Sequence, residues 1–292
     1  MENSAVSQHI ITLAQALARR NRRYHRTPGL RLRTAADIQQ FVDEVGLCLL
    51  FPVQGIESPN VYQAVAGFDK ATTAKHDDAT ISLTWNTKDQ ALSKRWWYYG
   101  KLIKSKATLV SLDLLPSFYA LSANYGEPDD YLQEYAAGTL TAEAKNIYEA
   151  LLNNGPMHTI ELKRKAGLYG DSLKGKFDKA LTELQVALKV MPTGVTEAGA
   201  WRYAFIYDIT SRWLPAETAR AQTLSRGDAR AAILARHLRN VVFATPKELT
   251  RIFGWTARET ASTIQQLVAG GQAALGVVVK GVEGEVVAHI EA

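Results

Sequence analysis

The sequence predicts a mostly α-helical protein with small β-hairpin wings, an α+β fold with a tandem winged-helix architecture. The main observation is that one order of elements, helix, short strand, helix, helix and hairpin, can be traced twice in the C-terminal half. With 292 residues, 47% of them hydrophobic and 22% charged, the chain is typical of a globular protein of two or three domains. We expect a mostly helical N-terminal domain over 1–138, itself a candidate for an elaborated winged helix, and winged-helix domains over 139–215 and 216–292.

The first copy of this order starts with an amphipathic helix that Thr141 caps. A short strand over 157–159 and a brief helix over 160–166 come next, and a third helix with an apolar stripe follows. Aromatic and aliphatic residues alternate over 201–209, which predicts a strand that pairs with 189–193 around a Gly-rich tip. This is the order of a winged helix.

The second copy begins with a helix from near Ser225. Pro246 opens the next helix at its first turn, and Thr256 caps the third helix. The strands of a second hairpin are expected over 274–279 and 285–290. Because two separate stretches match the same five-element order, we predict tandem winged helices.

The N-terminal region is less regular and is predicted to be mostly helical. Helices are expected over 7–22, over 34–45 behind a capping box that starts at Thr34, over 61–66 and over 84–102. The stretch 109–122 predicts one strand-like step followed by another helix.

Basic residues are concentrated in two acid-free segments, against a modest net charge of +5 and a pI of about 9.1. Seven arginines lie between Arg19 and Arg33, and five lysines or arginines lie between Lys94 and Lys106, around the aromatic run 96–99. Such clusters suit phosphate oxygens, and the alternative for either segment is a solvated basic face. We expect alternate rings of 96–99 to pack in the core and one ring to stay exposed and stack on DNA. The residues predicted to contact DNA here are Arg19, Arg20, Arg22, Arg23, Arg26, Lys101, Lys104 and Lys106.

The third helix of each predicted winged helix supplies further candidates, because such a helix enters the major groove of DNA. Basic residues are frequent in and beside this helix of the first copy and rarer in the second. The alternative is that these charges only keep the surface soluble and that the wings bind protein. The predicted DNA contacts in this group are Lys163, Arg164, Lys165, Lys174, Lys176, Lys179 and Arg258.

The composition excludes several classes of protein. Cys48 is the only cysteine, which excludes a disulfide framework and a cysteine-based zinc cluster. The six histidines have no ligand spacing, and the sequence has no P-loop, dinucleotide fingerprint or GxSxG motif, so we predict neither a metal nor a cofactor. No apolar run is long enough for a membrane span and no secretory signal is recognisable, which predicts a cytoplasmic protein.

Two stretches resemble a known family: FPVQGIESPN over 51–60 and WWYYGKLIKSKATLVSLDLLPSFYALS over 96–122. Together with the tandem winged helices they resemble the AlkZ/YcaQ family of DNA glycosylases, which excise alkylated bases and unhook interstrand crosslinks. The family carries a Gln-x-Gln or Gln-x-Asp motif in the first stretch, where this chain has Gly55 and Glu57, with Gln54 one position early. A family histidine in the second stretch corresponds here to Thr108.

The resemblance implies a protein that binds double-stranded, alkylated DNA and hydrolyses the N-glycosidic bond, with Glu57 and Gln54 as candidate catalytic residues. A base that already bears positive charge needs little help to leave, and a carboxylate can hold and activate the attacking water beside the cationic sugar. The alternative role of Glu57 is to stabilise the start of a helix over 59–66, where a negative charge is favoured. The alternatives for the whole protein are a non-catalytic winged-helix DNA binder or transcriptional regulator, and a protein-interaction scaffold.

Overall fold

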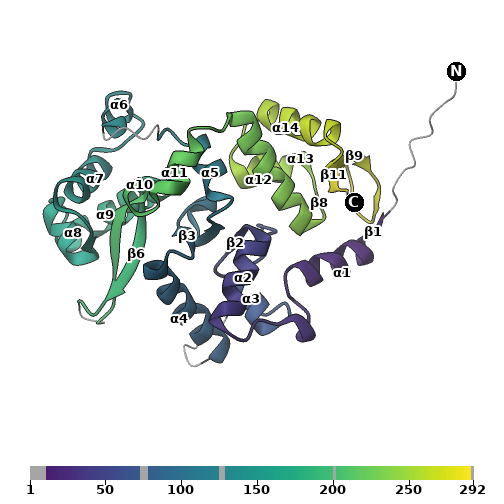
Figure 1. The fold of residues 1–292 in the computed structure, drawn as a ribbon, viewed down its shortest axis with the longest axis horizontal. Helices are drawn as coiled ribbons and strands as arrows, with labels where there is room; N and C mark the ends of the chain where they lie inside the picture. The colour runs from purple at the N-terminus through teal and green to yellow at the C-terminus, as the bar shows by residue number, and fades with distance from the viewer. Residues whose placement is uncertain (1–10, 73–77, 125–128, 200–201, 291–292) are drawn as a thin grey trace, which may run out of the picture.

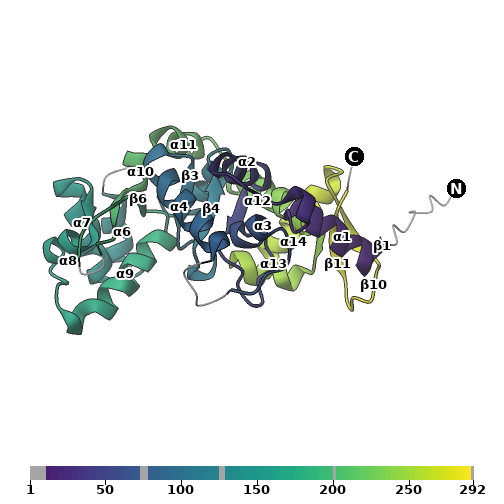
Figure 2. The same cartoon turned by 90° about the horizontal axis from the view of Figure 1, so that it is seen from below.

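The computed structural model describes residues 11–72, 78–124, 129–199 and 202–290, which form three units in a row (Figure 1). The N-terminal unit lies in the middle, the second unit at the left and the C-terminal unit at the right, and the view in Figure 2 keeps this order. Each unit has the order helix, strand, helix, helix and hairpin. The prediction of a mostly helical fold with small β-hairpin wings is confirmed.

The first unit packs three helices on a small sheet. The strands are antiparallel in the order β2-β4-β3, and Leu109 of the central strand lies opposite Cys48 on one side and Tyr99 on the other. A capping box at Thr34 starts the first helix, as predicted. The elements are α2 (Ala35–Val45), β2 (Leu47–Leu49), α3 (Val61–Ala66), α4 (Ala79–Lys94), β3 (Trp97–Gly100) and β4 (Thr108–Ser111).

The second and third units repeat this topology. Their sheets have the orders β5-β7-β6 and β8-β11-β9, in which the last strand of the hairpin again lies in the centre. The second unit contains α7 (Ala142–Asn154), β5 (Met157–His158), α8 (Thr159–Lys165), α9 (Lys174–Val186), β6 (Val190–Thr196) and β7 (Ala204–Ile209). The third unit contains α12 (Arg226–Val241), β8 (Phe243–Ala244), α13 (Pro246–Phe253), α14 (Ala257–Ala269), β9 (Ala273–Val277) and β11 (Val286–His289).

Short elements connect the three units. At the N-terminus, β1 (Ile11–Thr12) pairs in parallel with β10 (Val279–Lys280), which brings α1 (Leu13–Arg23) beside the third unit (Figure 1). Helix α5 (Leu115–Leu121) packs against α12 and α11. The other connecting elements are η1 (Pro28–Leu30), η2 (Ile103–Ser105), α6 (Asp130–Ala136), η3 (Asp171–Leu173), α10 (Thr210–Trp213) and α11 (Pro215–Ala221).

The helix predicted over 84–102 is wrong from residue 95 onward. Helix α4 ends at Lys94 because Arg95 adopts a left-handed conformation with φ 54°, and the aromatic run continues as β3. Trp97 and both tyrosines of β3 are buried, and Trp96 packs half-buried against Trp97. The expectation that alternate rings of this run pack in the core is therefore wrong, because three consecutive rings are buried. Trp96 stays partly exposed with Lys94 4.8 Å from its ring centre, and its stacking on DNA stays a prediction.

Two predicted elements extend beyond the described residues. Of the helix predicted over 7–22, residues 7–10 lie outside them, and the described part begins at Leu13 behind the capping residue Thr12. Of the strand predicted over 201–209, residue 201 lies outside them, and β7 begins at Ala204.

A buried lysine fixes the wing of the second unit to the first unit. The side chain of Lys88 in α4 is fully buried, and its Nζ pairs with Asp89 at 2.6 Å and donates to the Tyr203 hydroxyl at 2.9 Å. The same ammonium lies 4.1 Å from the ring centre of Trp85 and 4.5 Å from that of Phe205. These contacts hold the β6–β7 hairpin against α4, so this face of the wing is covered by protein.

In the described part of the chain, no helix combines the length and the hydrophobicity needed to cross a membrane. In the same residues, no three His, Cys, Asp or Glu side chains gather as ligands for one metal ion. Cys48 is buried within the first unit, which raises the pKa of its thiol.

Candidate active site

The two catalytic candidates, Gln54 and Glu57, lie in and directly after a tight turn between β2 and α3. The amide of Ile56 donates to the carbonyl of Val53 at 3.1 Å, which places Gln54 and Gly55 at the exposed tip. Gly55 has φ +76°, a conformation that side chains of L-residues rarely adopt. The turn therefore explains a glycine at the position where the resemblance places a glutamine.

An arginine of the third unit holds this turn from the opposite side. Nη2 of Arg251, at the end of α13, donates to the carbonyl of Gly55 at 2.7 Å. The turn of the first unit is thus attached to the third unit, and the position of its backbone depends on both.

Glu57 follows the turn and is bound by two arginines from the N-terminal segment. Its Oε2 lies 3.0 Å from Nη1 of Arg20, and its Oε1 lies 3.6 Å from Nη2 of Arg26. The carboxylate is oriented by both guanidinium groups, yet 44% of the side chain is exposed. A ligand can therefore reach it.

The alternative that Glu57 stabilises the start of the following helix is wrong. Helix α3 begins at Val61 and is capped by Asn60, whose Oδ1 accepts from the amide of Gln63 at 2.9 Å. Glu57 lies three residues before this cap, and the contacts of its carboxylate are with arginines instead.

The side chain of Arg20 joins three segments of the chain: α1, the end of α12 and the segment that carries Glu57. The residue is 7% exposed, and its Nε and Nη2 donate to the carbonyl of Val241 at 2.9 and 2.8 Å while Nη1 holds Glu57. This burial contradicts the predicted phosphate contact of Arg20. Arg26 is likewise committed to protein, because it stacks over Tyr24 at 4.5 Å and donates to Gln63 at 3.4 Å in addition to pairing with Glu57.

Two buried titratable side chains lie beneath this network and were not singled out from the sequence as site residues. Burial and the nearby Glu57 carboxylate raise the pKa of the Tyr24 hydroxyl well above its ordinary value. Burial and the charge of Arg20 lower the pKa of His237 to about 4, so this imidazole is neutral at pH 7. The available signal for His237 was its place beside Leu234 and Leu238 on the inward face of a helix.

Glu57, Arg20 and His237 line one cavity of about 240 Å³ between α1, the turn and the third unit. Glu248 and Arg251 of α13 add further charge to its wall, and the remaining lining is mostly apolar. The cavity thus places one exposed carboxylate at the edge of a small, partly apolar space.

Thr108 lies apart from this cavity. It is fully buried in β4, where its hydroxyl accepts from the amide of Ile103 at 3.1 Å and donates to the carbonyl of Lys106 at 2.8 Å. The structure therefore does not bring Thr108 together with Glu57; its side chain shapes the loop between β3 and β4.

The other residues predicted to contact DNA fall into groups in all three parts of the molecule. Helix α1 lies beside the third unit, Lys101, Lys104 and Lys106 lie between β3 and β4 of the central unit, and α9 belongs to the second unit (Figure 1). Among them, Arg23 lies 3.9 Å from Glu44, Lys163 covers Phe177 at 4.9 Å, and Lys176 pairs with Glu143 at 3.4 Å. The predicted residues with exposed side chains are Arg19, Arg22, Lys101, Lys104, Lys106, Arg164, Lys165, Lys174, Lys176, Lys179 and Arg258.

Comparison with known proteins gives the chain a family. The DNA glycosylase AlkZ of Streptomyces sahachiroi has a similar structure, with a TM-score of 0.60 over 96% of this chain and 70% of that one, at 13% sequence identity. No curated protein matches the sequence significantly. The model of a family described as AlkZ related matches residues 32–254, a range that includes the turn, Glu57 and Arg251. Because this range is well over half of the chain, the protein belongs to the AlkZ-related family.

Proposed function

We propose that the protein binds double-stranded DNA and hydrolyses the N-glycosidic bond of alkylated bases at Glu57. The observation that carries this proposal is an exposed carboxylate, fixed by Arg20 and Arg26 at the edge of a cavity, at the position where the resemblance places a catalytic side chain. Membership of the AlkZ-related family and the similar fold of a DNA glycosylase support it. A cytoplasmic location stays a prediction.

The proposed hydrolysis needs one main catalytic group from the protein, the carboxylate of Glu57. An alkylated purine leaves readily because its positive charge is lost as the glycosidic bond breaks. Glu57 accepts a proton from a water molecule beside the cationic sugar, while its negative charge stabilises that cation. Arg20 and Arg26 keep the carboxylate in place, and His237, neutral at pH 7, adds no charge to the wall of the cavity.

A second candidate, a DNA binder without catalysis, is favoured by the same two arginines. Their positive charges offset the negative charge of Glu57, which weakens its effect on a cationic transition state. Gly55 also removes one side chain of the family motif. In this case the protein binds DNA through the same surfaces but does not hydrolyse the glycosidic bond.

The experiment that separates the two candidates measures DNA binding and base release in the same samples. Duplexes with and without N-alkylated bases are titrated across a salt series, and abasic product is quantified. The proposal expects affinity that falls steeply with salt, because phosphate contacts release counterions, together with abasic product from alkylated DNA. Binding without product supports the second candidate, and no binding even at low salt leaves the protein-interaction scaffold.

Glu57→Gln is the decisive variant, with Glu44→Gln as its matched control. Glu44 is 41% exposed and also lies near two basic side chains, Arg23 and His25, each at 3.9 Å. We expect Glu57→Gln to slow base release by about a hundredfold or more with unchanged DNA affinity, and Glu44→Gln to leave both unchanged. Base release at the normal rate in Glu57→Gln would exclude Glu57 as the catalytic carboxylate. Gln54→Ala tests in the same assay whether Gln54 contributes.

A further inference from the structure

A larger cavity adjoins the Glu57 pocket along α13. Its volume is about 460 Å³, and Ile252 of α13 lines both spaces. Cavities that hold small molecules measure about 300–1,000 Å³, a range that includes the larger cavity and not the smaller one. The walls of this cleft come from the η2 loop, α5, α13 and the starts of α12 and α14, and Val186 and Leu188 add a part of the second unit. It therefore lies where the three units meet.

The cleft is positively charged. Three cations line it, Lys104, Arg226 and Arg230, against one acid, Glu259, which gives a formal net charge of +2 (three minus one). Arg230 is held by Glu259 at 3.0 Å. The exposed Arg226 donates to the neutral carbonyl of Ala120 at 3.4 Å, and Lys104 is exposed. Lys104 and Arg226 are thus placed to attract an anion.

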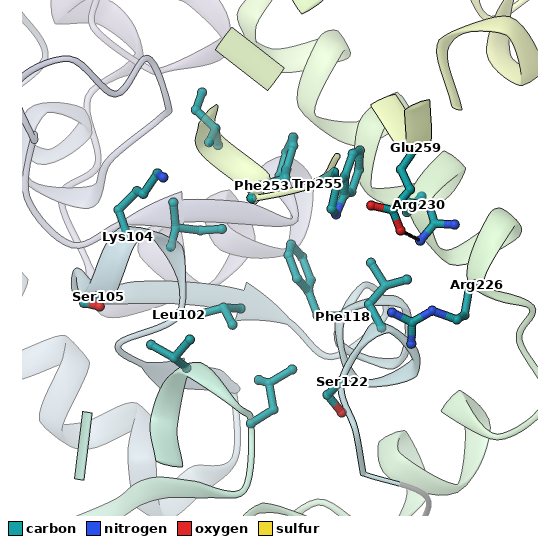
Figure 3. Close-up of a pocket in the computed structure, with 16 residues that line it drawn as sticks. Leu102, Lys104, Ser105, Phe118, Ser122, Arg226, Arg230, Phe253, Trp255 and Glu259 are labelled. Carbon is teal, nitrogen blue, oxygen red and sulfur yellow. Dashed lines mark hydrogen bonds and ion pairs between the residues drawn. The ribbon is translucent and has the colours of Figure 1, made fainter. Parts of the chain in front are cut away.

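Aromatic rings form the part of the cleft between these two cations. Phe253 and Trp255 are stacked, with ring centres 4.6 Å apart and an angle of 20° between their planes. Figure 3 shows these rings and Phe118 between Lys104 on one side and Arg226 on the other. Stacked aromatic surface between cations suits a flat, aromatic ligand that carries negative charge.

The loop that carries Lys104 is held in an unfavourable conformation. Lys104 and Ser105 are consecutive left-handed residues, with φ 50° and 56°, and neither is a glycine. Each such residue costs about 1–2 kcal/mol. The hydroxyl of Thr108 fixes both ends of this loop through Ile103 and Lys106. Backbone strain of this kind is frequent at ligand-binding sites. Here the strained conformation determines the position of Lys104.

We propose that this cleft binds one unpaired nucleotide, with its base against Trp255, between Lys104 and Arg226, whose positive charges attract the phosphate. A nucleotide combines the flat aromatic surface and the negative charge that the cleft selects, and it has two sources, a free mononucleotide or one unpaired position of a DNA strand. The proposal is independent of hydrolysis at Glu57, because binding in the cleft requires no bond to break.

The test measures binding by calorimetry with three probes: deoxyadenosine monophosphate, a duplex with one unpaired adenine, and the same duplex fully paired. We expect Lys104→Asn and Arg226→Gln each to weaken binding of the mononucleotide by about tenfold, because each removes a positive charge that attracts the phosphate. Asparagine is chosen at position 104 because it tolerates the left-handed conformation. Trp255→Leu, which keeps an apolar side chain, should weaken binding about tenfold because the base no longer stacks on an aromatic ring.

Arg220→Gln is the matched control for Arg226→Gln, since Arg220 is exposed and does not line the cleft. Thermal unfolding of each variant checks that the fold is retained. If the duplex with the unpaired adenine binds more tightly than the paired duplex, the natural ligand is a nucleotide of DNA. If the two duplexes bind equally and the mononucleotide binds tightly, the natural ligand is a free nucleotide. The proposal is overturned if neither probe is preferred to paired DNA, or if folded Lys104→Asn and Arg226→Gln bind as the unmodified protein does. Glu57→Gln should still bind the mononucleotide, so a failure of the glycosylase proposal and a failure of this proposal can be told apart.

Discussion

The arginines of α1 and the lysines of α9 were both predicted from the sequence to contact DNA, and they differ in the structure. Arg20 is 7% exposed and donates to the carbonyl of Val241, whereas Lys174 and Lys179 are exposed on α9. Arginine makes several directed hydrogen bonds from one rigid group, so it can connect segments in the interior, while lysine carries a strongly hydrated point charge. The comparison teaches that one arginine of a basic cluster can be buried and join segments of the candidate site, whereas the lysines of α9 keep their charges at the surface.

The largest expected effect is on stability, from Arg20→Met. The substitution removes two hydrogen bonds to Val241 and the pairing with Glu57, so we expect the free energy of unfolding to fall by about 3–4 kcal/mol. Urea unfolding at pH 7 measures this change. If the free energy of unfolding falls by less than about 0.5 kcal/mol, Arg20 behaves like an exposed surface charge, and the contrast between α1 and α9 is contradicted.

The second effect is on the pH dependence of stability, because burial, and after it the charge of Arg20, lowers the pKa of His237. The pKa of His237 is about 4 in the folded protein and about 6.5 when unfolded, so the unfolded state binds more protons between these values. Stability from this residue is present above pH 6.5 and is lost as the pH falls, by about 2–3 kcal/mol between pH 7 and pH 4. Unfolding of His237→Leu, measured in parallel, should lack this part of the pH dependence. An identical pH dependence in the variant would contradict the assignment.

The third effect concerns the exposed cluster. Changing Lys174, Lys176 and Lys179 together to alanine should leave stability nearly unchanged and weaken DNA binding about tenfold or more, or about 1.4 kcal/mol. The slope of log affinity against log salt should fall by roughly one for each phosphate group that the variant no longer binds. Fluorescence anisotropy with a labelled duplex measures both quantities. Unchanged affinity and slope would remove α9 from the DNA-binding surface.

The smallest effect is expected from Arg22→Met, the matched partner of Arg20→Met on the same helix. Arg22 is exposed, so we expect the free energy of unfolding to change by less than about 0.5 kcal/mol. The difference between the two variants, measured in the same urea titrations, isolates the effect of burial from that of charge. Equal losses would mean that both act through the net charge of α1.

Elements with local signals could be predicted from the sequence. The capping box at Thr34 and the proline at position 246 fix the starts of α2 and α13 within a few residues, so their bounds agree with the structure. Strand β3 could not be predicted, because its burial depends on distant residues. The hydroxyl of Tyr98, for example, donates to the carbonyl of Gln185 in the second unit.

The candidate site also has one part that could be predicted from the sequence and one part that could not. Glu57 was found through the motif around it, and the turn at Gly55 is a local feature of the chain. Its surroundings were not found, because Arg20 reaches Val241 and Arg251 reaches Gly55 across most of the sequence. Residues that meet across such a separation leave no periodic or spacing signal.

The joining of the first and last parts of the chain has a consequence for synthesis on the ribosome. Strand β1 pairs with β10, Arg20 binds Val241, and Gly55 is held by Arg251. A nascent chain that has not yet reached the third unit already contains Glu57, yet it lacks the groups that position Arg20 and the turn. The carboxylate therefore acquires its native surroundings only late in translation, when these long-range contacts close, and unfinished chains carry no assembled centre.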